Sequence, residues 1–282
     1  DIDYPFYVTA HEVAHQWFPH RASPARAEGM AFLSETFAQY VAMRVMEEQF
    51  GPNLIGKYLR YELDRYLLGR GVSRFEERPL GTVHQQQHIY YNKGSLAIYA
   101  AADLIGRDVM DATLAQYLER FDGAGPPYPT SNDFFEILYA NAAPEHHGAL
   151  EDLFEKITFF DLAVEDASCE ALGSNRYRVS LDLTASKAYA DGVGELTPAT
   201  LDDVIEVGVF AERRVLRKTK PKTLELERRR LTGDTRVIFE VDQLPLRAGI
   251  DPFFKQIDRR PGDNVVDLDC GDGPPAAVGA PG

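Results

Sequence analysis

The sequence has 282 residues, 44% of them hydrophobic and 26% charged, which predicts a packed globular protein of one large or two ordinary domains. Its net charge of -14 argues against a nucleic-acid partner, because that function needs a basic surface. No window of about 18 apolar residues occurs, so no membrane-spanning helix is predicted. Cys169 and Cys270 allow one disulfide but imply no disulfide framework, and they leave the cellular compartment open.

The first half of the chain has helical periodicity. Residues 5–18 predict a helix with Pro5 in its first turn and Pro19 at its end. Residues 30–50 predict a second helix, mostly apolar on its surface, which we expect to be buried on several sides. Further helices are predicted over 53–68, 91–105, 108–121, 131–141 and 146–157, with loops over 19–29 and 70–87.

From about residue 160 the pattern changes to a period of two. The segments 176–183, 204–209 and 236–241 alternate polar and apolar residues, as half-buried strands do. Turn residues separate them, which is typical of a small β-sandwich. We therefore expect an α+β chain of more than one domain. Its parts are a mainly helical domain over 1–160, a β-sandwich over 161–268 and a disordered Gly/Pro/Ala-rich tail over 269–282.

A metal-binding motif, His11-Glu12-Val13-Ala14-His15, lies on the first predicted helix. Residues four apart face the same way in a helix, so His11 and His15 can present two imidazoles to one zinc ion. Glu12 can take a proton from the attacking water and return it to the leaving amine. The alternative is two histidines bonded to ordinary neighbours, but the helical context is the one that the motif requires.

A zinc site of this kind needs a third protein ligand. A third histidine six positions after His15 would indicate a metzincin, but Arg21 stands there and His20 is one residue short. Glu28 lies in a loop-like stretch and is a weak candidate. Glu35 lies within the apolar second helix, where a carboxylate is costly unless it is paired or binds a metal. Two histidines from one helix and a glutamate from the next form a site of thermolysin type, although Glu35 could also be a helix-surface acid.

Residues 11–18 and 33–40 together resemble the gluzincin aminopeptidase family, of which aminopeptidase N is the best-known member. The resemblance implies a thermolysin-like helical domain followed by a β-sandwich, and one Zn²⁺ held by His11, His15 and Glu35. The family usually places one residue fewer between the second histidine and the glutamate, and it has Asn and Gly where this chain has Ser34 and Thr36. An extra loop residue is easily absorbed, and the ligand set stays intact.

A second match is Tyr91-Asn92-Lys93-Gly94, which resembles the family's tyrosine shortly before a Lys-Gly pair at a helix start. The resemblance implies that Tyr91 donates a hydrogen bond to the oxyanion of the tetrahedral intermediate, a contribution of several kcal/mol in such enzymes. Tyr90 is the neighbouring alternative. Without the first motif, either tyrosine could be an aromatic core residue.

Residues 58–67 and 251–255 narrow the resemblance. They look like the peptidase portion of bacterial membrane proteins that fuse a transporter-type permease to an aminopeptidase-like domain. This implies a permease partner and a membrane-tethered location in a longer protein, of which we expect the sequence to be a fragment. The family's Gly-x-Met-Glu-Asn motif, whose glutamate binds the substrate's amino group, does not occur in the 282 residues. We therefore expect the isolated chain to bind zinc but to cleave aminoacyl reporters poorly.

Three functions remain to be compared. The favoured one is a zinc metallopeptidase acting on peptides, most of all an aminopeptidase, with Glu12 as the general base. A non-catalytic binding or sensor module beside a permease is the alternative, and the intact Glu12 and Tyr91 argue against it. A thermolysin-type endopeptidase is the third, and the Lys93-Gly94 match and the β module argue against it. Four further histidines are interpreted as ordinary polar residues. His84 and His88 lie in a Gln-rich loop before Tyr91 and could also approach the cleft, and His146 and His147 look like a solvated helix start.

Overall fold

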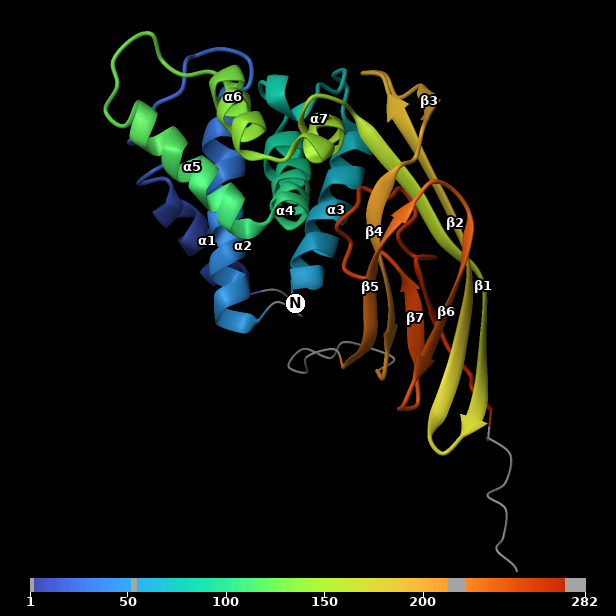
Figure 1. Cartoon of the computed structure of the whole chain (residues 1–282). Coiled ribbons are helices and arrows are strands. Elements are labelled where there is room, and N and C mark those ends of the chain that lie inside the picture. The colour runs from blue at the N-terminus through green and yellow to red at the C-terminus, as the bar shows by residue number, and fades with distance from the viewer. Residues whose placement is uncertain (1–2, 52–54, 213–221, 272–282) are drawn as a thin grey trace, which may run out of the picture. The chain divides into compact units, whose positions relative to one another are not determined.

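The computed structural model describes residues 3–51, 55–212 and 222–271, and the chain divides into two compact units. Figure 1 shows helices in the first part of the chain and strands in the second, so the predicted α+β class is confirmed. The main break between the units falls between Phe159 and Phe160, next to the predicted domain boundary. Of the predicted tail, residues 272–282 lie outside the described residues.

The helical unit contains Asp1–Phe159 and two later segments, Ala188–Thr197 and Lys255–Ile257. Its α-helices are α1 (Tyr4–Ala14), α2 (Phe37–Phe50), α3 (Ile55–Val72), α4 (Gly94–Ile105), α5 (Arg107–Phe121), α6 (Ser131–Asn141) and α7 (His147–Phe154). Two π-helical turns precede α2 and α4, namely η1 (Phe32–Thr36) and η4 (His88–Lys93). Short 3-10 turns are η3 (Leu80–Thr82) and η5 (Pro144–His146).

Helix α4 is the central helix of this unit and contacts α2, α3, α5 and α7 (Figure 1). Its residues 94–102 are all buried, and three of them are consecutive alanines, which allow neighbouring helices to approach closely. An aromatic cluster that includes Phe32, Phe37 and Phe134 fills the space between η1, α2 and α6. This core fixes η1 and the start of α2, and η1 carries Glu35, one of the predicted metal ligands.

The later segment Ala188–Thr197 belongs to the helical unit because its backbone bonds to the helical part of the chain. Ala190 N donates to the carbonyl of Ile157, and Glu77 N donates to the carbonyl of Gly192. The sequence pattern did not predict this return of the chain. Its consequence is that a segment from the strand-rich half supports the loop that follows α3.

Within the described residues the strands form two antiparallel sheets of four strands each. In the first, β2 (Arg176–Ala190) pairs with β1 (Thr158–Gly173), β3 (Leu196–Ala199) and β6 (Thr235–Val241). The second has the order β5 (Thr223–Leu231), β4 (Asp203–Phe210), β7 (Arg247–Ile250) and β8 (Val265–Asp267). The three strands predicted from alternation lie within β2, β4 and β6 and are confirmed.

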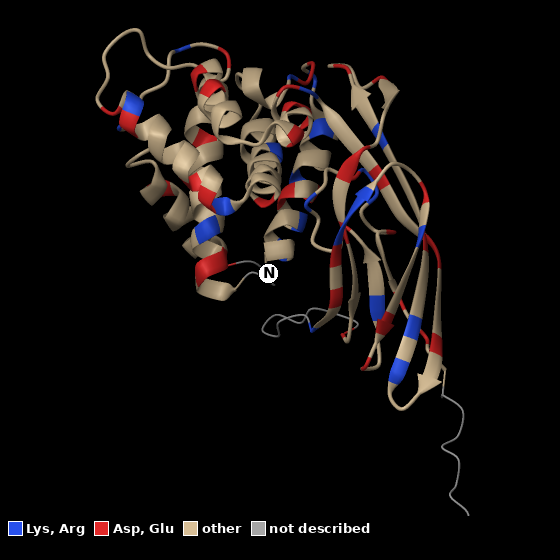
Figure 2. Ribbon diagram, in the orientation of Figure 1, with Lys and Arg blue, Asp and Glu red and all other residues tan. Residues whose placement is uncertain are grey.

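One apolar cluster draws side chains from both sheets, including Leu181 of β2, Val237 of β6 and Val207 of β4. Leu181 and Val237 are direct partners in the β2–β6 register, so both contribute to the same buried layer. The polar positions of these strands carry charges of both signs (Figure 2), as where Arg176 of β2 pairs with Glu240 of β6. A disulfide joins Cys169 of β1 to Cys270 beyond β8. Among the helices of the described ranges, none has both the length and the low polarity needed to cross a membrane.

Candidate metal centre

The three predicted metal ligands lie together. His11 and His15 stand at the end of α1, and Glu35 projects from the π-helical turn η1. Oε2 of Glu35 is 3.3 Å from Nε2 of His11 and 3.4 Å from Nε2 of His15. Within the part of the chain that the structure describes, these residues form the group whose ligand atoms could hold a metal ion, all within 4.8 Å of one another.

The surroundings of these atoms fit a divalent cation. Oε2 of Glu35 and Nδ1 of His11 are buried, and no described residue offers either atom a hydrogen bond of good geometry. A buried carboxylate oxygen in this state is costly, and a cation shared with two imidazole nitrogens would compensate it. Two nitrogens and one oxygen are the protein ligands of a catalytic zinc site, which keeps a further position open. The donor set therefore fits zinc.

The orientation of His15 is set by the chain that follows it. Nδ1 of His15 lies 2.6 Å from the carbonyl oxygen of Phe18. A carbonyl can only accept, so Nδ1 carries the proton and Nε2 keeps its lone pair towards Glu35. This contact also explains why α1 ends at Ala14, four residues before the predicted end. After Ala14 the backbone turns more tightly, with Trp17 N donating to the carbonyl of Ala14, which brings Phe18 back towards the imidazole.

Glu35 is held in its ionised form. Burial raises the pKa of this carboxyl, but its interactions with His11, Tyr91 and His15 outweigh burial, and the net pKa is lowered from its ordinary value. A negatively charged ligand suits a cation site. The next residue, Thr36, is fully buried and donates from Oγ1 to the carbonyl of Tyr90 at 2.6 Å. The turn that presents Glu35 is thereby bonded to the turn that presents Tyr91.

Tyr91 faces the candidate ligands. Its ring centre is 5.7 Å from that of His11. Burial, followed by the charge of Glu35, raises the pKa of the Tyr91 hydroxyl well above its ordinary value, so the hydroxyl remains protonated and can donate. The neighbouring Tyr90 instead packs partly against the hydrophobic core. Of the two tyrosines weighed from the sequence, the structure therefore places Tyr91 beside the ligands.

Glu12 lines the same cavity as His11 and Tyr91. The cavity has a volume of about 950 Å³, is open to solvent and is bordered by α1, α3 and the segment 85–92. Glu12 is exposed, so its carboxylate is accessible to water and to a substrate in the cavity. The two candidates for acid–base and oxyanion roles therefore share one cavity with a metal ligand.

The other candidates lie outside the metal group. His20 is exposed, and Glu28 pairs with Arg78 at 2.6 Å. His88 lines the cavity, where its ring stacks on Tyr66, and burial lowers the pKa of its imidazole. The remaining three histidines do not belong to the group of possible metal ligands found among the described residues: His84, His146 and His147.

Sequence reasoning missed two buried carboxylates beside this site, Glu62 and Glu77. Glu62 accepts hydrogen bonds from Tyr7 and Asn92, and Glu77 accepts them from Tyr66, Arg70 and Lys93. A signal existed for Glu62, since it lies on an apolar helix face as Glu35 does. No comparable signal marked Glu77, which follows α3 in a loop of charged residues.

Comparisons with known proteins identify the family of the chain. Residues 3–153 match the sequence model of the Peptidase family M1 domain. The Caenorhabditis elegans protein named "Putative aminopeptidase-2" is 28% identical over 132 residues, which is 45% of this chain and 7% of that protein. The chain thus spans less than a tenth of that curated relative.

Two solved structures show distant likeness. An aminopeptidase A from Legionella pneumophila, in complex with aspartic acid, is 17% identical over 95% of this chain and 27% of its own, with a TM-score of 0.47. A mutant M1 zinc metallopeptidase from Deinococcus radiodurans, bound to a Tyr-Ser-Ala substrate, is 23% identical over 52% of this chain and 32% of its own, with a TM-score of 0.41. Because the family model matches more than half of the sequence, this chain belongs to peptidase family M1, the aminopeptidase N-like gluzincin zinc metallopeptidases.

Proposed function

We propose that this chain is the catalytic core of a zinc aminopeptidase, with one Zn²⁺ per chain held by His11, His15 and Glu35. The observation that carries the proposal is the convergence of these three ligands, with His11 lining a cavity that Glu12 and Tyr91 also border. In this proposal the helical unit is a thermolysin-like catalytic domain, and the two sheets form a β-sandwich. The family match supports a peptide as the substrate.

Each residue has a separate task in the hydrolysis. When bound, zinc lowers the pKa of a water towards neutrality and polarises the scissile carbonyl. Glu12 accepts a proton from the attacking water and delivers it to the nitrogen of the leaving amine. Tyr91, whose hydroxyl stays protonated, donates a hydrogen bond to the oxygen that becomes negative in the tetrahedral intermediate. His15 is oriented for its task by the carbonyl of Phe18.

We further propose that the full-length protein carries a membrane permease and holds this chain at a membrane. The resemblance of residues 58–67 and 251–255 to permease–aminopeptidase fusions supports this. The Cys169–Cys270 disulfide favours an oxidising compartment for the peptidase part. Thiol labelling of the protein after denaturation, with and without prior reduction, tests whether the disulfide forms. Protease accessibility in sealed membrane vesicles tests on which side of the membrane the peptidase part lies.

The experiment that tests the catalytic proposal uses the full-length protein, wild type and Glu12→Gln. Zinc per chain is measured, together with hydrolysis of peptides that have either free or acetylated N-termini. We expect one zinc per chain in both proteins. We also expect removal of N-terminal residues by the wild type only, with a loss of about 10²–10⁴-fold in the variant. Glu48→Gln, at an exposed position of α2, is the matched control and should keep full activity.

The other outcomes separate the competing functions. Bound zinc without Glu12-dependent cleavage would favour a non-catalytic binding or sensor module. Cleavage within acetylated peptides would favour an endopeptidase. A wild-type protein that binds no zinc would overturn the proposal. The isolated chain is expected to bind zinc while cleaving aminoacyl reporters poorly, so strong activity on such reporters would contradict that expectation.

A further inference from the structure

Glu62 is a buried carboxylate next to the candidate metal centre. It lies on α3, is only 1% exposed, and belongs to the lining of the cavity that contains His11. Both of its oxygens are used: Oε1 accepts from the hydroxyl of Tyr7 at 3.0 Å, and Oε2 accepts from Nδ2 of Asn92 at 2.6 Å. Hydrogen bonds to an ionised carboxylate are among the strong ones in proteins.

The two donors come from the two elements that carry the site. Tyr7 is on α1, four residues before His11, so it lies one turn away on the same face of the helix. Asn92 follows Tyr91 directly on η4. Glu62 therefore connects the helix of the metal ligands to the turn of the oxyanion donor.

Burying this carboxylate is unfavourable, which implies a compensating role. Burial raises the pKa of Glu62 to about 7, although the hydrogen bonds from Asn92 and Tyr7 act in the opposite direction. An apolar side chain of similar volume would fill the same space without that cost. What an apolar side chain could not do is fix two donors from different elements at defined positions.

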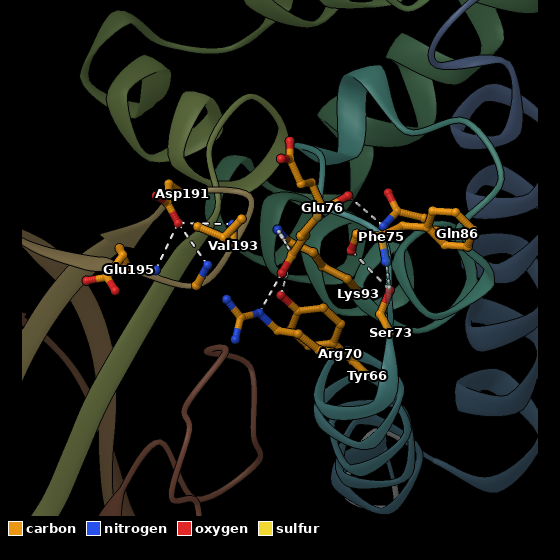
Figure 3. A network of polar contacts seen from close by, with 12 residues as sticks. Tyr66, Arg70, Ser73, Phe75, Glu76, Gln86, Lys93, Asp191, Val193 and Glu195 are labelled. Carbon is orange, nitrogen blue, oxygen red and sulfur yellow. Dashed lines mark hydrogen bonds and ion pairs between the residues drawn. The ribbon is translucent and has the colours of Figure 1, made fainter.

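A second buried network holds the Tyr91 turn from another direction but does not reach α1. Nζ of Lys93 lies 3.1 Å from Oε1 of Glu77, which also accepts from Tyr66 at 2.6 Å. Figure 3 shows the side chains of Lys93, Tyr66 and Arg70 converging from η4 and α3. Lys93 thus ties the Tyr91 turn to α3 and to the loop after it. The hydrogen bonds that connect the Tyr91 turn to the metal-ligand helix α1 are those of Glu62.

We propose that Glu62 is a positioning residue that fixes the metal-ligand helix α1 and the Tyr91 turn relative to each other. This inference rests on the proposed function, since it assumes a metal at His11 and an oxyanion donor at Tyr91. Removing a group that orients a metal ligand through hydrogen bonds typically lowers metal affinity or activity by about 10–100-fold. Glu62 acts on both parts of the site at once.

The test compares Glu62→Met with Glu62→Gln in the full-length protein. Methionine is similar in length but accepts neither hydrogen bond. We expect zinc affinity, measured by competition with a chelator, to fall about tenfold. We also expect kcat to fall while KM changes little, because Tyr91 acts on the transition state. Glutamine can accept from Tyr7 and donate to the amide oxygen of a rotated Asn92, so it should restore both properties to within about threefold of wild type.

Variants of the two donors separate the two links. Tyr7→Phe removes only the hydroxyl and should weaken zinc binding while sparing kcat at saturating zinc. Asn92→Leu should lower kcat while sparing zinc affinity. The double variant should reproduce Glu62→Met in both properties, because it removes the same two hydrogen bonds.

Glu47→Met is the matched control for general loss of stability. Glu47 is also a buried carboxylate that accepts from a tyrosine, Tyr99 at 3.0 Å, but it lies twelve residues beyond Glu35 on the same helical stretch, roughly 18 Å away. Glu47→Met should lose stability and keep its zinc affinity. If Glu62→Met behaves in the same way, with unchanged zinc affinity and kcat, Glu62 is only structural and the inference is overturned. A wild-type protein without zinc would overturn the proposed function and this inference together. If the protein binds zinc but shows no turnover, the proposed function fails alone, and the zinc affinity of Glu62→Met measured by chelator competition still decides whether Glu62 positions the metal-ligand helix.

Discussion

Different interactions stabilise the interior of each of the two units. In the helical unit, buried carboxylates join separate elements around the candidate site, with Glu62 bonded to α1 and η4 and Glu77 bonded to α3 and η4. In the strand-rich unit, alternating apolar side chains of both sheets share one cluster, and a disulfide closes the chain from Cys169 to Cys270.

This difference teaches what each kind of interaction can do. Apolar burial is non-directional, so it stabilises a fold without fixing one atom against another. A buried carboxylate with two or three donors fixes angles and distances, but it is strongly destabilising if one partner is lost. The helical unit carries the candidate site, and its networks of buried carboxylates lie next to the residues whose positions the proposed chemistry depends on. We therefore expect changes in the strand-rich unit to alter stability alone, and changes in the networks to alter both stability and the site.

The largest expected effect concerns the disulfide. Replacing both cysteines, Cys169→Ser with Cys270→Ser, opens a cross-link between residues 101 apart in sequence. In the chain-entropy description, a closed loop of that length contributes about 5 kcal/mol to the free energy of unfolding. Denaturant unfolding should show a loss of this order, and chelator competition should show unchanged zinc affinity. Weakened zinc binding at full stability would contradict the separation of roles. Wild-type protein treated with a reductant is the matched control.

The second effect is a loss of about 4 kcal/mol on Glu77→Gln, because the change leaves the Lys93 ammonium, 1% exposed, without its charged partner. Burial raises the pKa of Glu77, but Lys93, Tyr66 and Arg70 outweigh burial and the net pKa is lowered. The carboxylate therefore contributes stability above its ordinary pKa of 4.5, and this contribution is lost as the pH falls through the lowered value. The measurement is denaturant unfolding at neutral and acid pH.

The control for this prediction removes both charges. Glu77→Met with Lys93→Met should be more stable than Glu77→Gln alone, because no buried charge is left without a partner. If the single variant loses less than about 1 kcal/mol, the network does not hold the Tyr91 turn in the way that we describe.

Some of this organisation was available from the sequence. The spacing of His11 and His15 predicts a shared helix face, and the position of Glu35 among apolar residues predicts a carboxylate with a special partner. The structure brings these three together. Alternation of period two located three of the strands, β2, β4 and β6, because it reflects which side chains face the core.

The rest depends on packing between distant residues. Tyr7 and Glu62 are 55 residues apart, and Glu62 and Asn92 are 30 apart. No local pattern states which buried donor meets which acceptor, since the pairing follows from how α1, α3 and η4 pack. The early end of α1 was missed for a similar reason. The residues up to Phe18 have helical periodicity, but the carbonyl of Phe18 meets the His15 imidazole through a tighter turn.

The third prediction separates Glu62 from Glu77 by the sign of a pH dependence. The pKa of Glu62 is raised from 4.5 to about 7 in the folded protein. A raised pKa means that its contribution to stability is fully present below 4.5 and is lost as the pH rises through about 7. Glu62→Gln does not titrate, so its stability relative to metal-free wild type should improve by up to about 3 kcal/mol between pH 4.5 and 8. A difference that stays constant over this range would show that Glu62 is not perturbed by burial.

The smallest effect concerns Thr36, where the chain departs from the glycine usual in the family. Its hydroxyl donates to the carbonyl of Tyr90. A Cβ atom at position 94 would lie 2.4 Å from Oγ1 of Thr36. The glycine at 94, directly after η4, therefore leaves space for the threonine at 36, so the two positions form one contact beside the Tyr91 turn.

Thr36→Val keeps the shape of the side chain and leaves the Tyr90 carbonyl without its donor, which should cost about 1 kcal/mol in denaturant unfolding. Thr9→Val, at an exposed position where the hydroxyl donates to the carbonyl of Pro5 within α1, is the control and should stay within about 0.5 kcal/mol of wild type. Because the aromatic packing of Phe32 and Phe37 that holds η1 remains, Thr36→Val should keep its zinc affinity. A large loss of zinc would mean that this single hydroxyl, rather than the aromatic core, sets the position of Glu35.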